Sequence, residues 1–147
     1  MNPWALGAAA LVGLSGIAMP VHGQTERSQL TVDISGLQDS QGQVCLSLFD
    51  RGTGFPSDRT KALQATCLPA TETAATFSDL APGSYAVSAY HDANDDNEFN
   101  RNFVGMPTEG FGFSQNPSAL TGPPDFGEAV FLVAGTETQI TIELNYF

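Results

Sequence analysis

The chain has 147 residues, enough for one domain, and 41% of them are hydrophobic, so a packed core is expected and wholesale disorder is not. Sixteen acidic residues stand against five basic ones, and the formal net charge of -11 excludes nucleic-acid binding, which needs clustered Lys and Arg. The same charge disfavours an anionic membrane surface and favours cations as partners.

The first 23 residues read MNPWALGAAALVGLSGIAMPVHG and contain no Asp, Glu, Lys or Arg. An apolar run over 4–19 precedes small residues that suit a signal-peptidase site. We therefore predict a signal peptide over 1–23, a polar lead-in over 24–28 and one domain over 29–147. The alternative is a retained membrane anchor, but the apolar run has only ~16 residues where about 20 span a bilayer. We expect a periplasmic or extracellular protein, with no membrane insertion after signal removal.

Two cysteines, Cys45 and Cys67, follow the signal peptide. They are too far apart for a C-x-x-C redox motif, and no second pair exists for a zinc ribbon. In an oxidising exported context the default is a disulfide, which here would join two strand-like segments and contribute ~3 kcal/mol. The alternative is a reactive thiol.

Alternation of apolar and polar residues predicts strands along most of the chain. The first run carries Leu30, Val32 and Ile34 and ends at Gly36. A short polar loop then leads to a second strand, which predicts a hairpin. About seven short strands without a long amphipathic helix indicate an all-β fold, an antiparallel β-sandwich. The strands are expected over 30–35, 44–49, 65–68, 74–77, 85–90, 130–133 and 140–144, with one helical turn over 56–63.

One long acidic, Phe- and Gly-rich segment interrupts this pattern, because residues 92–128 carry no convincing strand. A connection of this length inside a compact domain is either functional or disordered. Its aromatic residues argue for order, since they can pack the loop onto the sandwich. These residues are Phe99, Phe103, Phe111, Phe113 and Phe126.

The loop begins with oxygen-bearing side chains at alternate positions, Asp92, Asn94 and Asp96, followed by Glu98 and Asn100. This spacing matches the opening of an EF-hand loop, and calcium takes roughly six to eight oxygen ligands. We predict that Asp92, Asn94, Asp96 and Asn100 ligate calcium through their side chains, and Glu98 through its carbonyl.

The match to the EF-hand then fails. Asn97 stands at the sixth position in place of Gly, although Asn tolerates the left-handed backbone needed there. Phe103 stands where the bidentate Glu belongs, so a true EF-hand is excluded. A variant site could recruit Glu109 or Asp95. The alternative is a metal-free acidic loop of Asx turns. Mutual repulsion of the acidic groups argues for a counter-ion, and calcium is the predicted cofactor, with a Kd of ~0.1–1 mM.

Sequence motifs for catalysis are missing. The predicted mature chain has one histidine, His91, beside Asp92, so a zinc site built on several His is excluded. No G-x-S-x-G motif occurs, and no glycine-rich phosphate loop follows a strand. We expect no enzymatic activity. A hydrolase that uses His91 and Asp92 stays an alternative, which would require these groups to converge in a cleft with Glu109.

Four phrases occur in order: GQVCLSLFD at 42–50, GFP at 54–56, FSDLAPGSYAVSAYHDANDDNEFN at 77–100 and FVGMPTEGFGFSQNP at 103–117. Together they resemble a bacterial family of exported proteins known as domain of unknown function 2141 (DUF2141), over about 29–145. The resemblance implies an Ig-like or prealbumin-like β-sandwich outside the cytoplasm, and it implies no activity. Family members carry an H-D-x-N-x-N-G-x-x-D type loop, which here becomes His91, Asp92, Asn94, Asp96, Asn97 and Asn100.

Two functions follow as hypotheses. In the first, calcium holds residues 103–116 against the sheet, and this segment presents a binding surface for an envelope protein or glycan. In the second, Phe103, Met106, Phe111 and Phe113 form a surface that binds an apolar small molecule or lipid. The same aromatic residues could instead form a satellite core under the loop. Calcium dependence of loop order would favour the first hypothesis, and a deep apolar pocket the second.

Overall fold

A computed structural model describes residues 10, 12–13, 15–20, 23 and 25–147. The predicted signal peptide lies largely outside the described residues, and those of its residues that are described are exposed and belong to no helix or strand. Within the described residues, no helix is long and apolar enough to cross a membrane. The elements are β1 (Ser28–Ser35), β2 (Gln43–Phe49), η1 (Arg59–Lys61), β3 (Gln64–Pro69), β4 (Ala74–Leu80), β5 (Gly83–Asp92), β6 (Phe111–Phe113), α1 (Phe126–Ala129), β7 (Phe131–Val133) and β8 (Glu137–Glu143).

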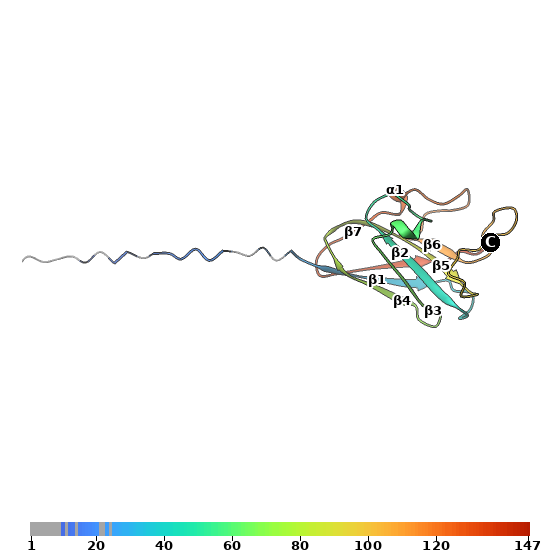
Figure 1. The fold of residues 1–147 in the computed structure, drawn as a ribbon, viewed down its shortest axis with the longest axis horizontal. Coiled ribbons are helices and arrows are strands. Elements are labelled where there is room, and N and C mark those ends of the chain that lie inside the picture. Colours follow the sequence, from blue (N-terminus) through green and yellow to red (C-terminus); the bar gives the residue numbers. More distant parts are fainter. Residues whose placement is uncertain (1–9, 11, 14, 21–22, 24) are drawn as a thin grey trace, which may run out of the picture.

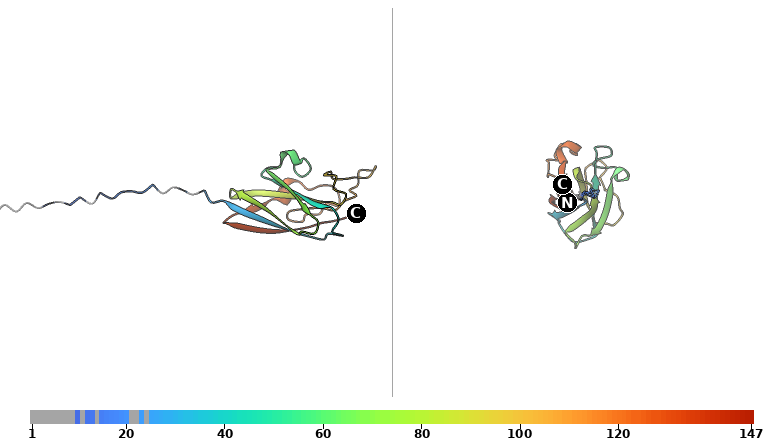
Figure 2. Two further views of the ribbon diagram at one scale, coloured as in Figure 1. Left: turned by 60° about the horizontal axis from the view of Figure 1, so that its bottom comes forward. Right: turned by 90° about the vertical axis from the view of Figure 1, so that its left-hand side faces the viewer.

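The strands form two sheets that pack face to face, as Figures 1 and 2 show. The smaller sheet has the order β4-β1-β8, and the larger has the order β3-β2-β5-β6, with β7 also paired to β5. The all-β sandwich prediction is confirmed. The pairing is antiparallel except between β1 and β8, which run parallel.

The predicted hairpin between the first two strands is wrong. β1 pairs with β4 and β8, whereas β2 pairs with β3 and β5, so the two strands lie in different sheets. The connection over 36–42 crosses from one sheet to the other. Both strands turn their apolar residues toward the shared interior, and alternation alone does not distinguish partners in one sheet from partners across the core.

The main core lies between the sheets and includes Leu30, Val32, Leu46, Val87 and Ile142, all without exposed surface. On β5 the alternate residues Tyr85, Val87 and Ala89 face this core, and the intervening residues face the outer side of the larger sheet. The outer side is also covered, so β5 is buried on both faces for most of its length.

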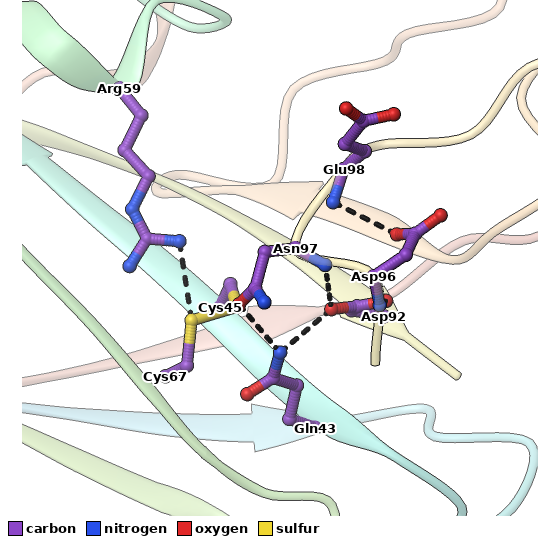
Figure 3. The surroundings of a disulfide bond; sticks show 8 residues. All are labelled: Gln43, Cys45, Arg59, Cys67, Asp92, Asp96, Asn97 and Glu98. Carbon is purple, nitrogen blue, oxygen red and sulfur yellow. Dashed lines mark hydrogen bonds between the residues drawn. A yellow bond between two sulfur atoms is a disulfide. The ribbon is translucent and has the colours of Figure 1, made fainter. Parts of the chain in front are cut away.

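The disulfide prediction is confirmed, because Cys45 of β2 and Cys67 of β3 are bonded to each other. They stand directly opposite in the register of the two strands, with their Cα atoms 4.1 Å apart. Cys45 also lies opposite Tyr90 of β5, so the disulfide is on the outer side of the larger sheet, close to the end of β5 (Figure 3).

The long segment after β5 is ordered and contains two elements that the sequence pattern did not predict, β6 and α1. β6 has three residues, and its central Gly112 breaks the apolar alternation that would mark a strand. The glycine is required by packing, since a Cβ there would lie 2.6 Å from the carbonyl oxygen of Glu143 and 2.7 Å from the Ile142 side chain.

A satellite core joins this segment to the outer side of the larger sheet. Phe111 and Phe113 are buried in it, and Phe99 and Phe126 are half-buried against it, which confirms that these four residues pack the segment onto the sandwich. The prediction was wrong for Phe103, whose side chain is fully exposed. Phe103 lies in a local turn outside the satellite core.

Candidate metal centre

Asp92 is the last residue of β5 and has no exposed surface. It stands opposite Gln43 of β2, whose Nε2 donates hydrogen bonds to Asp92 Oδ2 at 2.7 Å and to Asn97 Oδ1 at 2.9 Å (Figure 3). The carboxylate also accepts the backbone N–H groups of Asp96 at 3.1 Å and Asn97 at 2.8 Å. Asp92 thus fixes the turn that follows the strand.

The turn over 93–98 has two residues with positive φ, Asp95 at 55° and Asn97 at 61°. The left-handed backbone expected of Asn97 is therefore confirmed. The turn places Asp96 where its carboxylate accepts hydrogen bonds from three groups. These are the Glu98 N–H at 2.9 Å, the Asn100 Nδ2 at 2.9 Å and the Asn94 Nδ2 at 3.1 Å.

Glu109 approaches this turn from just before β6. It is 8% exposed, and its Oε2 accepts the N–H of Asn100 at 3.0 Å. Asp92, Asp96 and Glu109 each offer one carboxylate oxygen, and these atoms lie within 4.8 Å of one another. Oxygens bound to one calcium ion at about 2.3–2.6 Å lie no more than about 5 Å apart, so the spacing of the three carboxylates is compatible with a shared ion.

The electrostatics of this carboxylate cluster are unbalanced. Burial raises the pKa of Glu109, and the negative charges of Asp92 and Asp96 raise it further. Hydrogen bonds from the Asn100 side chain and the Glu98 N–H lower the pKa of Asp96. In the part of the chain that the structure describes, ion pairs involve other acidic residues, and none joins this cluster to Lys or Arg. A cation would supply the missing charge.

The other predicted ligands lie around the cluster in different ways. The side chains of Asn94 and Asn100 point at Asp96 with their nitrogens, and a half-turn of either amide would present its oxygen instead. The Glu98 carboxylate points away from Asp92 in Figure 3. Asp95 is exposed and is not part of the cluster.

His91 and Asp92 point to opposite faces of β5, as successive residues of a strand do. The His91 ring is buried, and its nitrogens are within hydrogen-bond distance of the Tyr146 hydroxyl at 2.9 Å and the Gln41 carbonyl at 2.6 Å. The convergence that a His91/Asp92 hydrolase requires is therefore not formed. His91 instead connects β5 to the C-terminal segment.

A small turn over 101–107, here called the tip loop, begins and ends at the cluster. Asn100 precedes it and Glu109 follows it, and the two are hydrogen-bonded to each other. Within the tip loop, Asn102 Oδ1 accepts the N–H groups of Val104 and Met106, both at 3.0 Å. This hydrogen-bonded turn exposes Phe103 completely, Val104 by 64% and Met106 by 42%.

The four residues predicted to form one contact surface, Phe103, Met106, Phe111 and Phe113, therefore lie in two different places. Phe103 stands alone at the tip loop, whereas Phe111 and Phe113 are buried and line a cleft together with the partly exposed Met106. Gln43, which holds Asp92 and Asn97, was not among the residues predicted from the sequence. No local motif could have indicated it, because the contact depends on the register between β2 and β5.

The sandwich with this acidic turn agrees with the family expected from the sequence. A family model described as "Uncharacterized protein conserved in bacteria (DUF2141)" matches residues 32–141, and the chain belongs to this family. The match spans the strands from within β1 to within β8 and includes the whole carboxylate cluster. No curated protein and no solved structure matches the chain.

Proposed function

We propose that this chain is an exported, non-enzymatic interaction module of the bacterial cell envelope whose tip loop is held in place by calcium. The single observation that carries the proposal is the position of the carboxylate cluster at both ends of the tip loop. Asp96 and Asp92 lie before the loop, Glu109 lies after it, and their oxygens are within 4.8 Å of one another.

The cluster has the composition of a hard-cation site. Two of its carboxylates, from Asp92 and Glu109, are buried, and their hydrogen bonds come from neutral donors that bring no balancing positive charge. The three clustered carboxylates and the amides of Asn94 and Asn100 can all offer oxygen ligands, and the set is larger than the one or two carboxylates that magnesium usually takes. These features favour calcium over magnesium.

The tip loop is the part of the molecule that we assign to the partner. It exposes Phe103, Val104 and Met106 in a turn closed by its own hydrogen bonds. A turn with a hydrogen-bonded backbone and exposed apolar side chains suits an apolar groove on an envelope protein, because less backbone conformational entropy is lost on binding. Calcium would act by fixing the two ends from which this turn projects.

Export is supported by two observations. The uncharged apolar segment over 1–23 has the composition of a signal peptide. The Cys45–Cys67 disulfide is typical of proteins that fold in an oxidising compartment such as the periplasm. Periplasmic or extracellular localisation is therefore part of the proposal.

The test is thermal unfolding of residues 24–147, oxidised and stripped with chelator, against added calcium or magnesium. An ion that binds only the folded state stabilises it by about 2.7 kcal/mol at a hundredfold excess over the Kd. We expect a calcium-selective rise in Tm that Asp96→Asn and Glu109→Gln each largely remove.

The matched control is Asp95→Asn. It makes the same charge change in the same turn, but Asp95 is exposed and outside the carboxylate cluster. Its calcium response should equal that of the wild type. A flat response of the wild type up to several millimolar calcium would refute the proposal, as would an equal response to magnesium and calcium at every concentration.

A further inference from the structure

A cleft with a volume of about 720 Å³ lies on the outer side of the larger sheet. Its floor includes Ser88 and Tyr90 of β5 together with Phe111 and Phe113 of β6. Its walls come from four segments, within 56–59, 97–101, 105–107 and 119–123. None of the three clustered carboxylates lines it. Ligand sites typically have volumes of roughly 300–1,000 Å³, so this cleft has the size of a small-molecule site.

The aromatic side chains of the cleft form a continuous apolar surface. The Phe99 ring centre is 5.7 Å from that of Tyr90 and 5.8 Å from that of Phe111. Phe111 in turn lies 5.8 Å from Phe113 and 5.6 Å from Phe147. Such a surface accepts a flat or alkyl body and gains free energy by removing it from water.

The charge at the cleft is opposite to that of the chain as a whole. Arg59 and Arg101 line it, and they are two of only five basic residues in a chain with a net charge of -11. Its lining includes one acidic residue, Glu98. Among the described residues, neither arginine takes part in an ion pair.

Both guanidinium groups are held at the cleft by neutral contacts. Arg59 Nη1 donates to Cys67 Sγ at 3.2 Å, and Arg101 Nη1 donates to the Gly105 carbonyl at 3.0 Å. The Arg101 guanidinium also lies 5.0 Å from the centre of the Phe99 ring. Each guanidinium has five N–H donors, which is more than these contacts use. A neutral apolar ligand would cover the two positive charges without compensating them.

We propose that this cleft binds a small organic anion, with an apolar body on the aromatic floor and a carboxylate or sulfonate paired with Arg59 and Arg101. The proposal does not depend on calcium binding, because the observations that support it are the cleft, its aromatic rings and its two arginines. It commits to a small molecule because the volume of the cleft, about 720 Å³, lies within the range typical of small-molecule sites.

The experiment measures fluorescence of anilinonaphthalene sulfonate with the folded, oxidised protein, in chelator and in calcium. We expect saturable one-to-one binding, and competition by octanoate but not by octanol. Arg59→Gln and Arg101→Gln should each weaken binding by about tenfold, as expected for the loss of a charge-assisted hydrogen bond. Arg101→Lys should retain part of the affinity because it keeps the charge.

Two further variants distinguish binding in the cleft from the effect of the protein's overall charge and from probe binding elsewhere on the surface. Arg27→Gln removes the same charge from a residue that pairs with Asp79 elsewhere, and it should change the affinity less than twofold. Ala119→Trp should fill the cleft and abolish binding while the circular dichroism spectrum and Tm stay those of a folded protein. Equal competition by octanol, equal loss in Arg27→Gln, or no saturable binding would each overturn the proposal.

Discussion

Replacing Glu109 by Gln should shift thermal stability in opposite directions with and without calcium. The Glu109 carboxylate is buried, and one of its oxygens lies within 4.8 Å of an Asp92 oxygen. At that separation two unit charges repel by about 0.9 kcal/mol even at the dielectric constant of water, and by more in a protein interior. The Gln side chain keeps an oxygen that can accept the Asn100 N–H, so the hydrogen bond is preserved. The metal-free variant should therefore be about 1 kcal/mol more stable than the wild type.

With calcium present the order should reverse. The wild type should gain about 2.7 kcal/mol at a hundredfold excess of the ion over its Kd. The variant loses a charged ligand and most of this gain, so its Tm in calcium should fall below that of the wild type. One kcal/mol corresponds to roughly 4 °C for a domain of this size, which differential scanning calorimetry resolves easily. A variant that is less stable in chelator and equally responsive to calcium would refute the reasoning.

Three other predictions follow from particular contacts. First, burial raises the pKa of Glu109 above its ordinary value of 4.5, and the charged groups around it are Asp92, Asp96 and His91. The folded state therefore binds the Glu109 proton more tightly than the unfolded state does. Stability of the metal-free protein should therefore fall as the pH rises from about 4.5 through the raised pKa, and the difference from Glu109→Gln in urea unfolding should isolate this effect. Second, Phe103→Ala should change the free energy of unfolding by less than about 0.5 kcal/mol because the side chain is fully exposed, whereas Phe111→Ala should cost about 3–5 kcal/mol; equal effects would contradict the assignment of Phe103 to a contact surface. Third, the double variant Cys45→Ser with Cys67→Ser should lose about 3 kcal/mol, since the bond closes a loop with a sequence separation of 22, and an unchanged unfolding midpoint would contradict this.

The strands were predictable because their apolar residues face one interior. Alternation at Leu30, Val32 and Ile34 reflects burial on one face of β1, and the same signal marks β2 and β8. Alternation does not report which strand is the neighbour, so the pairing of β1 with β4 and β8 was missed. β6 was missed because Gly112, required by its close approach to β8, removes the apolar signal from a three-residue strand.

The candidate site was predictable to the extent that it is local in sequence. Asp92 and Asp96 belong to one turn, and the preference of Asn97 for a left-handed backbone agreed with its place in the EF-hand pattern. Glu109 could be named only as a possible recruit, because its approach depends on β6 pairing with β5. Gln43 could not be found at all, since its contact follows from strand register rather than from any spacing along the chain.

The position of the acidic turn relative to β5 explains why the carboxylate cluster and the cleft adjoin each other. The outer side of β5 ends with Tyr90 and Asp92, which are two residues apart and therefore share a face. Tyr90 contributes to the floor of the cleft, and Asp92 begins the carboxylate cluster. The chain then returns over this face through Phe99 and Arg101, which stand on either side of Asn100, a residue bonded to both Asp96 and Glu109. A cation bound by the cluster would consequently restrain one wall of the cleft, and a ligand in the cleft would restrain the turn that holds the cation. By linkage, each should raise the affinity for the other by the same factor.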